Sequence, residues 1–270
     1  MVFNIIKRKD DPIYLDCYTY SHYAYNHAKI NYAKNYIPDW WKREPSGTKD
    51  GGATIKHCSA FSSFYAKGIV IPLWGEVEII INPYKSDKSA YEWSSTNEDF
   101  DLTNHCHSKE QWSGFGDDSL WNVKFKSPWY FKTRDAVDFV WSSPTWSNPD
   151  TFNSLTILPA VIQCKTQQAT EINFVIQQKE KEQKINLPPL TPLAILHPMT
   201  ERKIKIRHHL VDVDKYNKIH RKSGGMILGG TFKEPNKLYS ERLLTEISKR
   251  TAKNEKFWKK ADELNKCPFE

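Results

Sequence analysis

The residues best suited to chemistry lie in the segment Asn104–Gln111, which reads Asn-His-Cys-His-Ser-Lys-Glu-Gln. Alternate residues of a β-strand point the same way, so a strand here would present the imidazoles of His105 and His107 on one face. Two histidines and one carboxylate form the ligand set of many non-haem iron sites, which keep positions open for substrate and oxygen. Glu110 is the nearest carboxylate, and it follows His107 by three residues. The segment therefore predicts a metal site.

A complete site of this kind needs a further ligand from elsewhere in the chain. We assign this place to His197, with His208 as the alternative, and either histidine would complete a cupin-like set. The expected cofactor is Fe(II) or another divalent metal. Two other interpretations stay open: surface histidines in a polar loop that bind nothing, and a zinc site that uses Cys106.

A second group of reactive side chains is the His57-Cys58 pair. A nucleophilic cysteine needs a base within hydrogen-bond reach, and adjacent residues rarely face each other. The spacing of Ile55, Cys58 and Phe61 instead predicts a short helix over Thr54–Ala66, with these three side chains on its apolar face. We therefore expect Cys58 to be a buried structural thiol.

Aromatic side chains are unusually frequent, with 10 Trp, 13 Tyr and 13 Phe among 270 residues. A large β core absorbs most of them, but tryptophans in polar loops can stack on flat ligands. The predicted binding surface therefore comprises Trp93, Trp112, Trp146 and the neighbouring Gln111.

Positive charge gathers at the C-terminal end of the sequence. Residues 201–270 carry a net charge of +8, and residues 1–200 a net charge of −1. Lys256, Lys259 and Lys260 surround Phe257-Trp258, an arrangement that can bind nucleic acid or an acidic partner. The alternative is a solvated helix whose cations cover the outer face while Phe257 and Trp258 pack inward.

Other function classes find no support in the sequence. It contains no Gly-x-Gly-x-x-Gly, no phosphate-binding loop, no Gly-x-Ser-x-Gly and no His-Glu-x-x-His. The five cysteines are scattered, which suits a reducing cytoplasm rather than a disulfide scaffold. No stretch has the apolar length of a signal peptide or a membrane helix, so neither secretion nor a membrane partner is expected.

The elements that must position these residues are mostly short strands. Their alternation of apolar and polar residues predicts strands at Ile69–Leu73, Glu76–Ile81, Trp121–Phe125, Pro128–Phe131, Val137–Trp141, Ser154–Gln163, Glu171–Gln177, Leu193–Leu196 and around Ile204 and Ile206. Helical periodicity follows at Asp212–Arg221 and Asn236–Asn265, and Asn82–Gly116 is expected to be a long polar loop.

This order of elements predicts a mainly β (α+β) protein with a sandwich or jelly-roll-like body and C-terminal helices. We expect the β-rich domain to cover residues 1–210. The basic helical extension, residues 211–270, is expected to pack on it.

Six short motifs occur together in the chain, at Pro38–Lys42, Thr54–Ala60, Gly68–Pro72, His107–Gln111, Phe125–Trp129 and Thr191–Pro198. In this order they resemble an uncharacterised domain family of bacteria and marine tailed phages, over roughly residues 30–215. The resemblance implies a bacteriophage origin, and a location in the cytoplasm of an infected bacterial host or in the virion. It implies no mechanism.

Three functions follow as hypotheses. The first is a phage protein with a small-molecule pocket, as in a metal-dependent oxygenase-type enzyme that uses His105, His107 and Glu110. The second is a non-enzymatic virion structural or interaction protein, which the absent catalytic motifs and the sandwich pattern favour. The third is a host-takeover factor whose basic tail binds nucleic acid or an acidic partner.

Overall fold

Strands dominate the part of the chain that the structure describes. The computed structural model describes residues 11–82, 91–96, 120–144, 146–147, 155–165, 170–178, 182–217 and 249. The strands are β1 (Ile13–Thr19), β2 (Asn31–Tyr32), β3 (Ile69–Pro72), β4 (Val77–Ile81), β5 (Tyr91–Ser95), β6 (Leu120–Lys126), β7 (Tyr130–Thr133), β8 (Asp138–Ser142), β9 (Leu155–Ile157), β10 (Ala160–Gln163), β11 (Glu171–Gln177), β12 (Gln183–Leu187), β13 (Pro192–Pro198) and β14 (Ile204–Leu210). The helices are α1 (His22–His27), α2 (Asp39–Arg43) and α3 (Ser59–Lys67), with 3-10 turns η1 (Ala33–Tyr36) and η2 (Ile55–His57).

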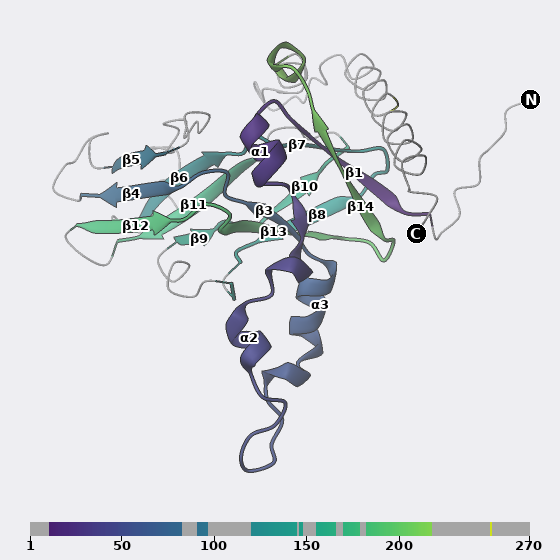
Figure 1. The fold of residues 1–270 in the computed structure, drawn as a ribbon, viewed down its shortest axis with the longest axis vertical. Helices are drawn as coiled ribbons and strands as arrows, with labels where there is room; N and C mark the ends of the chain where they lie inside the picture. The colour runs from purple at the N-terminus through teal and green to yellow at the C-terminus, as the bar shows by residue number, and fades with distance from the viewer. Residues whose placement is uncertain are drawn as a thin grey trace, which may run out of the picture.

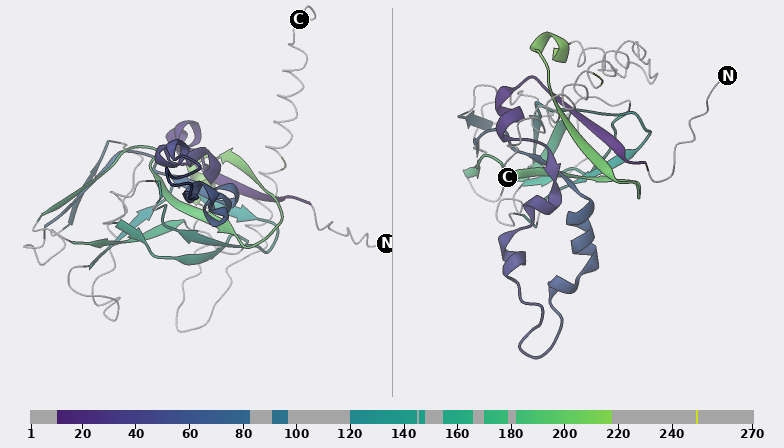
Figure 2. Two further views of the ribbon diagram at one scale, coloured as in Figure 1. Left: turned by 90° about the horizontal axis from the view of Figure 1, so that it is seen from below. Right: turned by 45° about the vertical axis from the view of Figure 1, so that its right-hand side comes forward.

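These strands form four sheets, which Figures 1 and 2 show gathered into one body. The largest has the order β10-β8-β13-β3-β2, and the three-stranded sheets have the orders β14-β1-β7, β6-β11-β9 and β12-β4-β5. Among the described strand pairs, β1 and β14 run parallel and the others antiparallel. The prediction of a mainly β, sandwich-like fold is confirmed.

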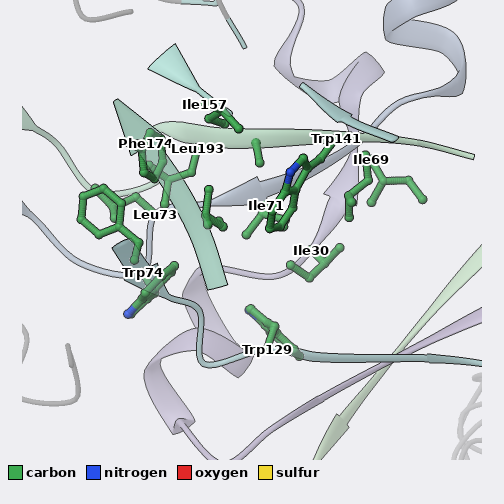
Figure 3. Close-up of a cluster of buried hydrophobic side chains, with 14 of the residues drawn as sticks. Ile30, Ile69, Ile71, Leu73, Trp74, Trp129, Trp141, Ile157, Phe174 and Leu193 are labelled. Atoms are coloured by element: carbon green, nitrogen blue, oxygen red, sulfur yellow. The ribbon is translucent and has the colours of Figure 1, made fainter. Parts of the chain in front are cut away.

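A single large apolar cluster lies between the sheets. In β4, Val77, Ile79 and Ile81 are fully buried and Glu78 and Ile80 are only half-buried, which is the alternation that the sequence predicts. Figure 3 shows Trp74, Trp129 and Trp141 within the cluster, together with isoleucines of β3 and Leu193 of β13. The indole N–H of Trp129 donates to the carbonyl oxygen of Ala28 at 3.0 Å, so this deeply buried ring leaves no polar atom unsatisfied.

A helical arm projects from this body, as Figure 1 and the right-hand view of Figure 2 show. We define the arm as residues 38–68, which comprise α2, a turn, η2 and α3. Its core is Phe61, which stacks on Trp41 with ring centroids 5.3 Å apart and meets Trp40 at 5.7 Å. Helices this short are stable only through packing, so this aromatic cluster holds the arm together.

The structure corrects four local predictions. The predicted helix Thr54–Ala66 is interrupted at Cys58, whose extended backbone separates η2 from α3. Cys58 is consequently exposed rather than buried, because the apolar spacing does not carry through the break. The predicted strand Ser154–Gln163 is two strands, β9 and β10, which belong to different sheets. Finally, β5 lies inside the predicted loop Asn82–Gly116.

The predicted C-terminal helices lie mostly outside the described residues. Residues 213–217 are helical, in agreement with the start of the predicted helix Asp212–Arg221. The backbone N–H of Lys215 donates to the Asp212 carboxylate at 2.8 Å, which caps this turn. Of Asn236–Asn265 the structure describes Lys249, which is helical.

Gly68 is the tightest junction between the arm and the body. A Cβ atom there would lie 2.7 Å from Ile195 Cγ2, 2.8 Å from the Phe64 carbonyl oxygen and 2.9 Å from Ala33 Cβ. Since one of these atoms is backbone, we expect Gly68→Ala to destabilise the protein by about 1–3 kcal/mol through overpacking.

Urea denaturation measures this loss, with Gly47→Ala as the matched control because its added Cβ would make only an ordinary contact at 3.5 Å. An unchanged midpoint for Gly68→Ala would show that the arm and the body separate easily.

Candidate functional site

An ion cluster lies on the outer face of the parallel strand pair β1–β14, opposite the apolar core. Asp16 is 3 % exposed and accepts two hydrogen bonds from Arg207, from Nε at 2.6 Å and Nη2 at 2.6 Å. His209 Nε2 donates a third to Oδ1 of the same carboxylate, at 2.8 Å. The parallel register places Asp16 opposite Arg207, and alternation puts His209 on the same face. The carboxylate thus fixes the positions of both basic side chains.

The direction of the Asp16 pKa shift indicates that its carboxyl group is ionised at neutral pH. Burial raises this pKa, but the hydrogen bonds and charges of His209 and Arg207 outweigh that effect and leave it below the ordinary value. Burial also lowers the pKa of Arg207, which the bonds and the charge of Asp16 raise above its ordinary value. The pair therefore remains a carboxylate and a guanidinium at neutral pH.

Arg207 in turn packs on the aromatic ring of Tyr14. Its guanidinium carbon lies 4.4 Å from the ring centroid, and Lys205 Nζ lies 6.0 Å from the same centroid. Tyr14 is 40 % exposed, so the ring carries cations and still meets solvent. The buried Asp16 therefore holds Arg207, and Arg207 supports Tyr14.

Tyr14 also lines a cleft of about 300 Å³ at the start of β1. The lining residues are Asp11, Pro12, Tyr14, Arg134, Asp135 and Arg202. Arg202 Nη1 is 3.4 Å from the Asp135 carboxylate, and its Nε donates to the backbone oxygen of Asp11 at 2.7 Å. Arg134 is exposed, and its guanidinium has no carboxylate partner among the described residues.

The cleft can hold an anion. A guanidinium presents several N–H donors in a plane and binds carboxylate or phosphate oxygens in pairs. Arg134 is free to do so, and Arg202 uses only part of its donors on Asp135 and Asp11. The second carboxylate, that of Asp11, is exposed at the cleft and offsets part of the positive charge that the two arginines give it.

Only some of the predicted metal ligands are among the residues that the structure describes. His105, His107, Glu110 and Cys106 lie outside the described residues. His197 lies on β13, where its Nε2 donates to the Phe64 carbonyl oxygen at 3.0 Å. No group of three potential metal-ligating side chains occurs within the described ranges. The iron site thus stays a prediction, and His197 could join it only through Nδ1.

His208, the alternative ligand, is likewise bonded to the backbone. Its Nε2 donates to the Ile30 carbonyl oxygen at 2.8 Å, and its ring meets Trp129 at 5.4 Å. It lies on the opposite face of β14 from His209. Each of the two candidate histidines therefore connects its own strand to another segment of the fold through a hydrogen bond.

Burial lowers the pKa of His197, and we expect a matching pH dependence of stability. The unfolded chain takes up the proton near the ordinary histidine value of about 6.5, whereas the folded chain resists it. Stability is therefore complete above this pH and falls as the pH drops below it. Urea midpoints between pH 7.5 and 5 should fall less in His197→Gln than in the native protein. Equal losses in both proteins would contradict this assignment.

The predicted binding surface of tryptophans is only partly described, since Trp112 and Gln111 lie outside the described residues. Trp93 lies in β5 opposite Ile79 and packs against the main core, so its expected position in a loop is wrong. Trp146 is 43 % exposed and packs edge-on against Phe61, with centroids 5.4 Å apart. Its carbonyl oxygen accepts the indole N–H of Trp40 at 2.8 Å. Trp146 therefore attaches the arm to the body.

The predicted nucleic-acid contacts Lys256, Lys259 and Lys260 lie outside the described residues. Within the described ranges, no helix is both long and apolar enough to cross a membrane.

Sequence reasoning missed the residues that form the cleft and the ion cluster. One signal was present: Asp16 interrupts the apolar run Ile13–Thr19, and a charge inside such a strand requires a buried partner. The identity of that partner was not encoded locally, because Arg207 is 191 residues away.

Three comparisons with known proteins identified no relative of this chain. A scan against protein-family models, a search of curated proteins and a search of solved structures each gave no match.

Proposed function

We propose that this protein binds a small anionic molecule in the cleft beside β1. The supporting observation is that Arg134 and Arg202 line one cavity of about 300 Å³, and that Arg134 has no carboxylate partner among the described residues. A volume of this size is at the lower end of those of small-molecule sites. This proposal keeps the small-molecule pocket of the first sequence hypothesis but does not use His105 or His107, which lie outside the described residues.

The ion cluster gives the cleft a rigid wall. Asp16 fixes Arg207, whose guanidinium lies against the Tyr14 ring. Binding sites gain affinity when the contact groups are already held in place, because less side-chain freedom is lost on binding. The anion would thus meet a preformed surface.

Titration calorimetry with inorganic phosphate tests the proposal. Loss of one charged hydrogen-bond donor costs about 1.5–3 kcal/mol, so Arg134→Gln should weaken binding roughly 10- to 150-fold. Arg43→Gln, on the arm, should bind as the native protein does. Absence of binding to the native protein, or equal affinity in Arg134→Gln, would contradict the proposal.

A second function rests on a different observation, the projecting arm. None of the residues of α2 is buried, and Ser59, Ala60, Ser62 and Ser63 of α3 are exposed. We propose that the arm contacts a protein partner, in line with the hypothesis of a non-enzymatic interaction protein. An aromatic cluster that holds two short helices outside the body supports this role, because such helices do not form unaided.

Photo-crosslinking in cells that naturally make the protein tests this second function. A photoreactive residue in place of Ser63 should give one discrete crosslinked product, whereas the same group at Val161, which is 58 % exposed on β10, should not. No product at Ser63, or the same product at both positions, would contradict the role of the arm.

A further inference from the structure

The cleft combines two kinds of surface, and together they define a ligand class. Arg134 and Arg202 supply the polar part. Pro12 and Tyr14 supply a flat apolar part, since residues two apart on extended backbone share a face. A ligand that matches both parts carries an anionic group and a planar ring.

The Tyr14 ring is held in place by its contact with Arg207, which favours stacking of a further planar group on it. Arg207 lies over it at 4.4 Å from the centroid and is held there by the buried Asp16. A ring supported in this way loses little freedom when a second planar group stacks on its exposed part. Tyr14 is 40 % exposed, so part of this residue is open to such a contact.

We propose that the ligand is a nucleoside monophosphate, whose base stacks on Tyr14 and whose phosphate binds Arg134 and Arg202. This inference rests on the proposed anion-binding function and goes beyond it by assigning the ring. Stacking on an aromatic side chain tolerates any base, because every base has a π face. The cleft therefore selects for a base joined to a phosphate, with little preference among bases.

Calorimetry with AMP and with ribose 5-phosphate separates the two contacts, because the second compound has the phosphate and no base. Base stacking predicts that AMP binds the native protein between roughly 5- and 150-fold more tightly than ribose 5-phosphate. Tyr14→Leu should remove this preference and retain the affinity for ribose 5-phosphate. Tyr14→Phe, which keeps the ring, should retain the preference.

The outcomes distinguish failure of this inference from failure of the proposed function. If AMP and ribose 5-phosphate bind the native protein equally well, the base is not recognised and only anion binding stands. A preference for AMP that survives Tyr14→Leu also overturns the assignment of the ring to Tyr14. If neither compound binds, the anion-binding function itself fails.

Discussion

Replacing Asp16 with asparagine should lower the stability of the protein more than any exposed charge substitution. The carboxylate is 3 % exposed, pairs with Arg207 and accepts a hydrogen bond from His209. Removing one partner of a buried ion pair costs about 3–5 kcal/mol, because the remaining charge stays desolvated. The thermal midpoint of Asp16→Asn should fall by on the order of 10 °C.

The control for this substitution is Asp39→Asn. Asp39 also pairs with a cation, Lys42 at 2.8 Å, but its side chain is 80 % exposed. Exposed pairs contribute little, so its midpoint should stay as in the native protein. Equal midpoints for Asp16→Asn and the native protein would show that the cluster does not stabilise the parallel pair.

The same substitution has a pH signature with a definite sign. The folded-state pKa of Asp16 is below the ordinary value, so its contribution is complete above the pKa of the unfolded chain, about 3.9. It is lost as the pH falls from there through the folded-state pKa. The stability difference between the native protein and Asp16→Asn should therefore be constant between pH 5 and 7 and shrink below pH 4.

Replacing Phe61 with alanine should unfold the arm while leaving the β body folded. Phe61 is 5 % exposed and contacts Trp40, Trp41, Tyr65 and Trp146. Truncation of a buried phenylalanine costs about 3–5 kcal/mol, and this loss falls on helices that do not form alone. Hydrogen exchange should then speed up in α2 and α3 and stay unchanged in β4 and β12.

Ser62→Ala is the matched control, since Ser62 is the next residue of α3 and is exposed. It should leave the exchange of α2 and α3 as in the native protein. Slow exchange of these helices in Phe61→Ala would show that other contacts hold the arm.

The strands were predictable where one face is buried. In β4 the alternation of Val77, Ile79 and Ile81 with polar or half-buried residues reports burial directly. The same pattern gave β8, β11 and β13 to within two residues. The helical periodicity gave a wrong prediction at Cys58. The extended backbone of this residue interrupts the helix, so apolar residues on its two sides no longer share one helix face, although their spacing is unchanged.

The candidate site was not predictable for a different reason. Asp16 and Arg207 lie 191 residues apart in the sequence and meet because β1 and β14 pair in parallel. Neither strand has a sequence feature that indicates which other strand it pairs with. The cleft similarly joins residues near positions 12, 134 and 202. The sequence patterns instead predicted a metal ligand at His197, whose ring is hydrogen-bonded to the backbone of α3.

The most direct test of the anion-binding cleft is the NMR spectrum of the arginine side chains during titration with phosphate. Substitution of each arginine by glutamine assigns its Nε–H signal. The signals of Arg134 and Arg202 should shift together and saturate, while that of Arg43 on the arm stays in place. If the Arg134 signal does not move, or if all arginine signals drift alike without saturation, phosphate is not bound in the cleft.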